Sequence, residues 1–330
     1  MKSLPRLGLV GATGLTGQVF LSIAEKSGLP GPAPRCFASE ATAGQTLTFR
    51  GQSIPLNALG PGCFADLDCV VFATSAGVSR EWAPQAVASG AWVVDKSSAF
   101  RLDPGVPLIV PEVNPQHLPA AGPCIIANPN CSTIQLVVVL APILAALGLK
   151  RVIVSSYQSV SGAGKSGTAQ LEAEIAGRLP SNPAFPRPIL GNVIPQIGPL
   201  ESDGYCEEES KLMAETRKIL DRPDLAITAT TVRVPSFVGH GEAVLIETER
   251  PTSVAALHEL LSGAPGVELH PEAADWPDPL SVAGRDPVAV GRVREAFCDG
   301  HSFWLWIVGD NLRKGAALNA WQSVGLLYKV

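Results

Sequence analysis

A short apolar segment that runs directly into a glycine-rich turn is the feature that most constrains this fold. Leu7–Val10 has the character of a buried strand, the turn Gly-Ala-Thr-Gly-Leu-Thr-Gly occupies residues 11–17, and residues 17–26 have helical spacing. Glycines allow the main chain to bend tightly between a strand and a helix. The combination predicts the first βα unit of a parallel sheet, although many tight turns need glycine for structural reasons alone.

Two further apolar runs, residues 69–73 and 91–95, flank a helical segment at 81–89. Nearly continuous apolar strands are typical of a sheet covered by helices on both faces. Beyond Lys150 the pattern changes to the alternation of half-exposed strands, which predicts a mixed sheet with helices on one face. The expected elements of this half are strands at 151–155, 227–234, 243–248, 288–293 and 303–308, helices at 164–179 and 207–220, and a terminal helix at 314–327.

Composition narrows the class of protein. A length of 330 residues favours two domains, and 46% hydrophobic against 17% charged residues argues against disorder. The net charge is -5, and the sequence has no Lys/Arg block. Both features argue against a nucleic-acid partner and favour a small substrate. The longest apolar run, residues 136–147, is shorter than the roughly 20 residues of a membrane span.

The seven cysteines are odd in number and form no Cys-x-x-Cys pair. This predicts neither a disulfide framework nor a metal site. With no signal-like apolar segment at the N-terminus, we expect a reduced, cytoplasmic protein.

The glycine turn also predicts a dinucleotide site, because a pyrophosphate binds to the free N–H groups of the helix that follows. The residues expected to contact it are Gly11, Thr13, Gly14, Leu15 and Thr16. The second strand, 35–38, ends at Ser39, Glu40, Ala41 and Thr42, where ribose specificity is usually set. Glu40 would favour a free 2′-hydroxyl, whereas the hydroxyls of Ser39 and Thr42 would suit a 2′-phosphate, so the sequence leaves this choice open.

Cys131 is the strongest candidate nucleophile. It follows Asn130, a good N-cap residue, and starts a long apolar helix whose free N–H groups and dipole stabilise a thiolate. The alternative, a small buried hydrophobic residue, is our interpretation of the other six cysteines. Of the five histidines only His240 lies in a glycine-flanked break between two strands, which makes it the candidate proton partner, although a structural histidine is the commoner case.

These motifs together resemble the aspartate-β-semialdehyde dehydrogenase family over almost the whole length of the chain. The matching segments are residues 11–14, 95–101, 110–114, 127–134, 157–164, 192–197, 215–220, 233–244 and 310–317. The resemblance implies an α/β protein with an N-terminal Rossmann-like dinucleotide-binding domain and an α+β catalytic and dimerisation domain with a mixed sheet. We expect residues 1–130 to form the first domain, with a C-terminal helix at 312–330 packing back on it, and residues 131–311 to form the second.

Such an enzyme interconverts aspartate-β-semialdehyde, phosphate and NADP⁺ with aspartyl-β-phosphate and NADPH, and the family feeds lysine (through diaminopimelate), threonine and methionine synthesis. The resemblance implies that Cys131 forms a thioester with the substrate. His240 would act as the base when the hemithioacetal forms in the oxidative direction. Gln158 would orient the substrate, and the family forms homodimers through the second domain.

The resemblance also assigns the binding residues. Arg233 would grip the α-carboxylate with its two-pronged guanidinium, and Glu208 would hold the α-ammonium. Lys211, Arg101 and Asn130 would receive the phosphate. Without the resemblance, Glu208 and Lys211 would be interpreted as a solvated i,i+3 surface pair. The nicotinamide would lie near Ser161 and Gly162, and Asn311 would close the coenzyme site.

Three positions depart from the family pattern. Ala41 stands where an arginine often reads the 2′-phosphate, so NADP is the expected cofactor and NAD stays possible. Lys96 replaces a usual asparagine, and Gly241 a usual serine beside His240. Two alternatives to the dehydrogenase are a non-catalytic paralogue that binds nucleotide or scaffolds a partner, and a cysteine hydrolase, which the glycine turn disfavours.

Overall fold

The computed structural model describes residues 4–120, 122–178, 180 and 182–329. The chain divides into two compact units, Met1–Pro129 with Ala316–Val330, and Asn130–Gly315. The last residue of the helix predicted at 164–179 lies outside the described residues.

The first unit contains a seven-stranded sheet in the order β3-β4-β2-β1-β5-β6-β7. All its pairings are parallel except β3 with β4. Strand β1 lies between β2 and β5, where the strand order reverses, and the carboxyl ends of strands at such a point form the usual ligand crevice of the fold. The elements of this unit are β1 (Leu7–Val10), α1 (Leu15–Lys26), β2 (Arg35–Phe37), β3 (Thr46–Phe49), β4 (Gln52–Asn57), β5 (Cys69–Phe72), α2 (Ala76–Ala88), β6 (Trp92–Asp95), η1 (Pro115–His117), β7 (Ile125–Ala127) and α8 (Leu318–Tyr328).

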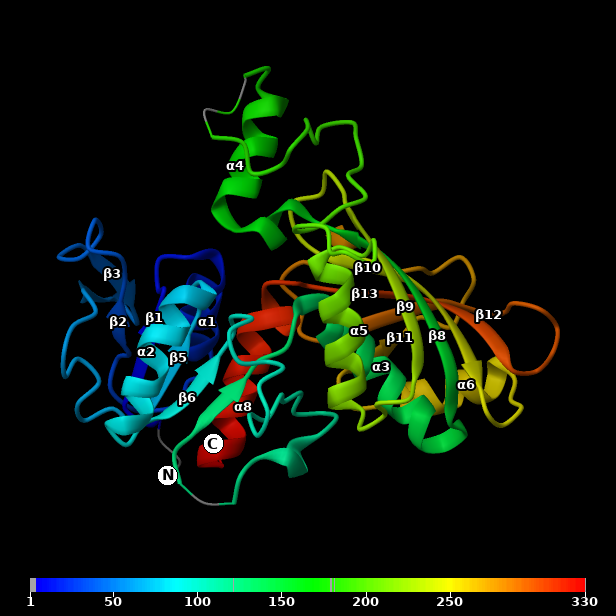
Figure 1. Ribbon diagram of the computed structural model, residues 1–330, viewed down its shortest axis with the longest axis horizontal. Helices are drawn as coiled ribbons and strands as arrows, with labels where there is room; N and C mark the ends of the chain where they lie inside the picture. The colour runs from blue at the N-terminus through cyan, green and yellow to red at the C-terminus, as the bar shows by residue number, and fades with distance from the viewer. Residues whose placement is uncertain (1–3, 121, 179, 181, 330) are drawn as a thin grey trace. The chain divides into compact units, whose positions relative to one another are not determined.

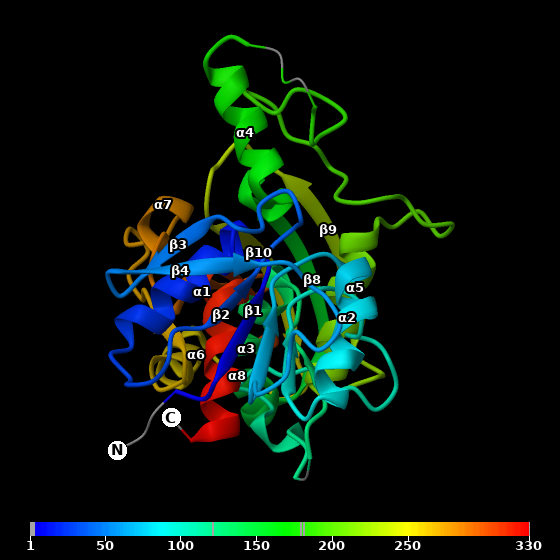
Figure 2. The same ribbon diagram turned by 90° about the vertical axis from the view of Figure 1, so that its left-hand side faces the viewer.

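Hydrophobic cores cover both faces of this sheet. Leu7 and Leu9 pack with α1 and α8 on one face, whereas Val10, Val70 and Phe72 pack with α2 on the other. Figure 2 shows α2 on one side of the strands and α1 with α8 on the opposite side. The predicted doubly covered parallel sheet is therefore confirmed.

The second unit contains a six-stranded mixed sheet in the order β11-β12-β13-β10-β8-β9. Helices α3, α5 and α6 pack against the sheet and against one another, as the right half of Figure 1 shows. The elements of this unit are α3 (Cys131–Leu147), β8 (Leu149–Gln158), η2 (Val160–Ala163), α4 (Gly164–Ile175), α5 (Glu207–Ile219), β9 (Ala226–Arg233), β10 (His240–Thr248), α6 (Val254–Ser262), β11 (Val267–Leu269), α7 (Pro279–Val282), β12 (Val288–Glu295), β13 (Ser302–Gly309) and the π-helical turn η3 (Arg313–Ala317).

The five strands expected in this half are all present, and the predicted mixed sheet is confirmed. The helix expected at 314–327 is instead η3 followed by α8. Helix α4 and the proline-rich segment after it form a small core of their own, built on Leu171, Phe185 and Ile189, and α4 stands apart from α3 and α5 in Figure 1. Among the described residues, no helix combines the length and apolar character needed to cross a bilayer.

Candidate active site

Cys131 is the first residue of α3, and Asn130 is its N-cap, as the sequence predicts. The Asn130 Oδ1 accepts a hydrogen bond from the main-chain N–H of Ser132 at 3.2 Å and from the Cys131 thiol at 3.2 Å. The side chain that caps the helix therefore also orients the sulfur. A thiolate at this position gains the field of the helix N-terminus.

Two residues without a sequence-based assignment hold the start of α3, with Asn130 and Cys131, in place. The buried Glu215 on α5 accepts a hydrogen bond from the Asn130 main-chain N–H at 2.7 Å. A Cβ added to Gly315 would lie 3.0 Å from the Cys131 Cβ, so glycine is needed for the close approach of the two chain segments. The partners lie 85 residues (Glu215 from Asn130) and 184 residues (Gly315 from Cys131) away along the chain, which is why sequence spacing gave no signal.

Gln158 is the last residue of β8 and contacts the start of α3. Its Nε2 donates to Ser132 Oγ at 2.7 Å and to Glu208 Oε1 at 3.0 Å. The alternative of an i,i+3 surface pair between Glu208 and Lys211 is not what the structure has, because Glu208 turns toward Gln158 and Lys211 pairs with Glu207 at 2.6 Å. Glu208 and Gln158 are thus joined by a hydrogen bond, and their assignments to the substrate stay predictions.

His240 is the first residue of β10 rather than part of a break, and it is completely buried. Burial lowers the pKa of His240 to about 3, and the nearby Arg233 charge acts in the same direction, while the Gly239 main chain acts in the opposite one. The main-chain N–H of Ser159 donates to Nδ1 at 3.1 Å. Since a main-chain N–H can only donate, Nδ1 accepts and the neutral ring carries its proton on Nε2. Among the described residues Nε2 has no hydrogen-bond partner.

Arg233 ends β9 and is 6% exposed. Its Nη1 donates to the Ser159 carbonyl at 2.8 Å, and its guanidinium lies 5.7 Å from the Phe185 ring centroid. Burial lowers the pKa of Arg233, while Glu208 and Cys131 act in the opposite direction. Within the described part of the chain no carboxylate lies within 4.0 Å of it, so this buried cation lacks the anionic partner that such groups require.

Gly162 faces the space between these groups. A Cβ there would lie 2.6 Å from Arg233 Nη1 and 3.4 Å from the His240 ring. Only glycine leaves this space open.

Asn311, expected to close the coenzyme site, is buried within the second unit. Its Oδ1 accepts hydrogen bonds from Ser159 Oγ, Ser161 Oγ and the Gly239 N–H at 3.2, 3.3 and 2.9 Å, and its Nδ2 donates to Ser161 Oγ at 3.0 Å. These bonds show that the amide ties together the two segments that hold the imidazole. Ser159, which contacts both His240 and Arg233, has no assignment from the sequence.

The glycine turn of the first unit joins β1 to α1 with no room for side chains at two of its glycines. Gly11 has φ +83°, and a Cβ on it would lie 2.3 Å from the Ala73 carbonyl oxygen. A Cβ on Gly17 would lie 2.3 Å from the Gly11 carbonyl oxygen, which shows how closely helix α1 approaches β1. No described side chain caps α1 and its first turn holds no acid, so the N–H groups at Leu15 and Thr16 are available to an anion.

The residues that follow β2, from Ser39 to Thr42, are called the ribose edge below. Ser39 Oγ and Thr42 Oγ1 lie 3.2 Å apart there, and Thr42 Oγ1 donates to the Ser39 carbonyl. Ser39, Glu40 and Ala41 are exposed, and Thr42 is half-buried. Arg101, also in the first unit, is buried and donates from Nη2 to the Lys96 carbonyl at 2.7 Å. Its assignment to the phosphate stays a prediction.

Comparisons with known proteins cover most of the chain. Residues 6–121 match the family model described as semialdehyde dehydrogenase, NAD binding domain, and residues 140–314 match semialdehyde dehydrogenase, dimerisation domain. An aspartate-semialdehyde dehydrogenase of Aquifex aeolicus is 42% identical over 98% of both chains.

Solved structures give the same result. Aspartate-semialdehyde dehydrogenase II of Vibrio cholerae, complexed with ASA, aligns with a TM-score of 0.92 and 37% identity over 99% of both chains. The enzyme of Candida albicans with NADP aligns with a TM-score of 0.79 and 25% identity over 99% of both chains. The protein is an oxidoreductase that uses a nicotinamide dinucleotide, and the chain belongs to the aspartate-semialdehyde dehydrogenase family.

Proposed function

We propose that this protein catalyses the reversible, NADP-dependent reductive dephosphorylation of aspartyl-β-phosphate to aspartate-β-semialdehyde, in the pathway to lysine, threonine and methionine. The observation that carries the proposal is the group of Cys131, Gln158, Arg233 and His240 in one unit. Each of these side chains, or its N-cap neighbour, is fixed by hydrogen bonds to the protein. The full set disfavours the alternative of a non-catalytic paralogue.

Cys131 is the proposed nucleophile. Its thiolate attacks the acyl carbon of the acyl phosphate, the bond to phosphate breaks, and a thioester forms. NADPH, when bound, supplies the hydride that reduces the thioester carbon. The resulting hemithioacetal oxyanion collapses to the aldehyde and releases the Cys131 thiolate, and the departing phosphate takes up the one proton that the overall reaction consumes.

His240 has a role that follows from its tautomer. The ring is neutral at physiological pH and presents Nε2–H, a donor whose hydrogen bond suits an oxyanion. To accept a proton at Nε2, the ring would have to move its own proton to Nδ1, against the Ser159 N–H. We therefore favour oxyanion stabilisation by His240 over the base role expected from the sequence.

The charged side chains fit an amino-acid phosphate. The guanidinium of Arg233, which has no carboxylate partner among the described residues, suits the α-carboxylate, and Glu208, held by Gln158, suits the α-ammonium. Lys211, Asn130 and Arg101 are proposed for the phosphate. In Lys211 the ammonium is already 2.6 Å from Glu207, so binding a phosphate would require it to exchange or share that partner.

For the coenzyme we propose NADP over NAD by a narrow margin. Gly11, Thr13, Gly14, Leu15 and Thr16 would hold the pyrophosphate. At the ribose edge, Ser39 and Thr42 hydroxyls and main-chain N–H groups, including that of Ala41, would hold the 2′-phosphate. Ser161 and Gly162 are proposed near the nicotinamide, with Asn311 acting through Ser161.

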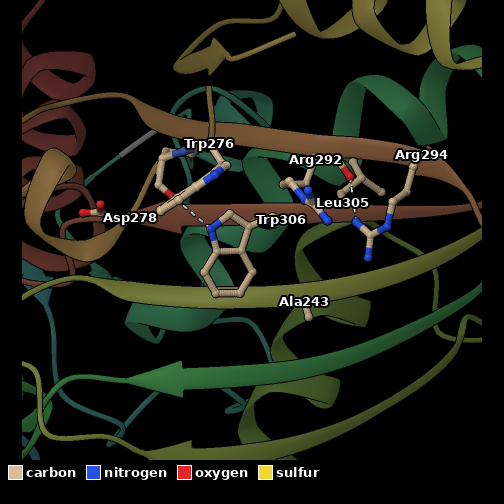
Figure 3. Close-up of a pocket in the computed structure, with 8 residues that line it drawn as sticks. Ala243, Trp276, Asp278, Arg292, Arg294, Leu305 and Trp306 are labelled. Carbon is tan, nitrogen blue, oxygen red and sulfur yellow. Dashed lines mark hydrogen bonds between the residues drawn. The ribbon is translucent and has the colours of Figure 1, made fainter. Parts of the chain in front are cut away.

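We further propose a homodimer built on the face of the six-stranded sheet that α3, α5 and α6 leave uncovered. Tyr157 is 41% exposed there, and its ring centroid lies 5.8 Å from that of Trp306. A pocket of about 300 Å³ on this face is lined by the indoles of Trp276 and Trp306 and the guanidinium groups of Arg292 and Arg294 (Figure 3). A second copy of the chain is the proposed occupant, and Ala243→Glu, which adds a charged side chain to the pocket wall, should halve the mass measured by light scattering.

All the cysteines that the sequence contains lie in the described part of the chain and none of them is in a disulfide, which suits an enzyme that works through a thiolate in the reducing cytoplasm. The activity is tested by following NADPH absorbance after adding semialdehyde, phosphate and either oxidised coenzyme. Phosphate-dependent reduction supports the proposal. Hydrolysis of an acyl substrate without coenzyme reduction would support a cysteine hydrolase instead, and inactivity of the folded protein would support a non-catalytic paralogue.

A further inference from the structure

Three consecutive glutamates begin helix α5, and each has a different partner. Glu207 pairs with Lys211, and Glu208 accepts a hydrogen bond from Gln158. Glu209 is 7% exposed and has no role in the proposed reaction. Because it directly follows the side chain proposed for the α-ammonium, its contacts decide where that side chain lies.

The two carboxylate oxygens of Glu209 bind two different elements. Oε2 accepts from the main-chain N–H of Cys206, the N-cap residue of α5, at 2.8 Å, which completes a capping box. Oε1 accepts from the main-chain N–H of Thr231 on β9 at 2.8 Å. The Cys206 thiol lies 3.3 Å from the Thr231 hydroxyl, a weaker contact beside it. A capping box needs only the first of these bonds, so the second ties the start of α5 to the strand.

Helix α5 packs on β9, the edge strand of the six-stranded sheet (Figure 1). Thr231 precedes Arg233 by two residues on the buried face of this strand. Arg233 stands opposite Gln158 of β8 in the sheet register, and Gln158 Nε2 donates to Glu208 Oε1. The bond from Glu209 to Thr231 therefore fixes the start of α5 next to Arg233.

Both bonds of Glu209 require an acceptor, because a main-chain N–H can only donate. A glutamine at this position would offer its oxygen to one N–H and set its own NH2 group against the other. A buried donor that faces another donor has no partner, so one of the two ties would be lost. The carboxylate is thus needed for its two acceptor oxygens.

The start of α5 has further bonds that do not depend on Glu209. The main-chain N–H groups of Glu207 and Glu208 donate to carbonyls of the 197–199 segment at 2.9 and 3.3 Å. These bonds hold the helix start to that segment and not to β9. Loss of Glu209 should therefore shift the start of α5 relative to the strand rather than unfold the helix.

We propose that Glu209 is a positioning residue that fixes the separation of Glu208 from Arg233 and so sets how tightly the enzyme binds the amino-acid end of its substrate. The inference rests on the proposed function, in which Glu208 holds the α-ammonium and Arg233 the α-carboxylate. Both oxygens of Glu209 are bound to main-chain N–H groups, so it acts through the placement of its neighbour and not by contact with the substrate.

Steady-state kinetics in the oxidative direction test this role. Glu209→Gln should raise KM for the semialdehyde about tenfold, and KM for the coenzyme and kcat should stay within about threefold of wild type. Glu208→Gln should also raise KM for the semialdehyde. Adding Glu209→Gln to Glu208→Gln should raise it by no more than about twofold further, because the misplaced side chain has already lost its charge. An unchanged KM in Glu209→Gln, or a tenfold rise in both backgrounds, would overturn the inference.

The matched control is Ser253→Ala, at the start of another helix of the same unit. Ser253 Oγ accepts from the Ala256 N–H at 3.2 Å and caps α6. Its loss should lower the unfolding midpoint and leave KM for the semialdehyde unchanged. An equal rise of KM in Ser253→Ala and Glu209→Gln would overturn the positioning role, because any weakened helix start would then suffice.

Amide hydrogen exchange, followed by NMR, provides a readout without turnover. The Thr231 N–H should exchange slowly in wild type and at least about tenfold faster in Glu209→Ala, which removes its acceptor. Equal exchange rates in the two proteins would overturn the inference even if the enzyme is active. A wild type without activity on the semialdehyde would instead overturn the proposed function, and the substrate role of Glu209 with it, whatever the exchange rates are.

Discussion

The catalytic group of the second unit and the ribose edge of the first unit are built in opposite ways. Gln158, Arg233 and His240 are 1%, 6% and 0% exposed, and each makes hydrogen bonds to other parts of the protein. Glu40 and Ala41 are exposed, and the Ser39 hydroxyl lies beside Thr42 in its own turn. A buried polar group that loses its partner has no water to replace it, whereas an exposed edge exchanges protein contacts for solvent. Substitutions should therefore be severe in the first region and graded in the second.

The largest effect is expected at Cys131. Cys131→Ala should abolish turnover and leave the fold and coenzyme binding intact, because the thioester has no other point of attachment. Circular dichroism and coenzyme titration check the fold, and Cys298→Ala, at an exposed cysteine, is the control that should keep full activity. More than a few per cent of activity in Cys131→Ala would rule out the thioester.

The next effect is expected at Arg233. Arg233→Lys keeps the charge but loses the two-pronged donor, so KM should rise and kcat should fall, with a loss of about 2–5 kcal/mol in kcat/KM. Steady-state kinetics measure this directly. Arg294→Lys, on the uncovered sheet face, should leave kcat/KM unchanged. If both substitutions lowered kcat/KM equally, the effect at Arg233 would not show a role in binding the substrate.

The pH dependence of stability tests the burial of His240. The folded state holds this imidazole neutral down to about pH 3, whereas an unfolded histidine takes up a proton near pH 6.5. The unfolded state therefore binds more protons between these values, and wild type should lose roughly 1.4 kcal/mol per pH unit as pH falls through this window, relative to His240→Gln.

Glu242→Gln, at a completely buried acid of β10, should give the opposite sign. Burial raises the pKa of Glu242, so the stability of its neutral form is complete below about pH 4.5 and is lost as pH rises above it. Relative to this variant, wild type should thus become less stable with increasing pH. The free energy of unfolding of wild type, His240→Gln and Glu242→Gln is measured in urea at about pH 5, 6 and 7. If it changes with pH at the same rate in all three proteins, neither group is buried as described.

The smallest effect is expected at the ribose edge. Ala41→Arg adds a charged partner for a 2′-phosphate where neutral donors now stand, and it should widen the preference for NADP about tenfold, mainly through KM. The ratio of kcat/KM for NADP and NAD in both proteins decides this. A wild type that prefers NAD would show that Glu40 faces the ribose.

The parts of the molecule that could be predicted are those with a local signal. The strands β1, β5 and β6 are short apolar runs, and Asn130 before Cys131 is a recognisable helix start. The hairpin of β3 and β4 gave no such signal, because its strands are short, half exposed and polar on one side.

The supporting residues of the site could not be predicted from spacing. Gln135 looks like one polar interruption of an apolar helix, but its Nε2 donates to the main-chain carbonyl of His240, 105 residues away. The pairing of Lys211 with Glu207 rather than with Glu208 depends in turn on Gln158, on another strand. Such choices are made by tertiary contacts, which override local preference.

The hydrogen bonds of Asn311 have a consequence for the order of folding. This one amide joins segments at 159–161 and 239 that lie about 150 and 72 residues from it along the chain. Closing loops of this length is slow compared with forming helices or hairpins. During refolding the imidazole should therefore reach its final position late, and recovered turnover should lag behind recovered secondary structure.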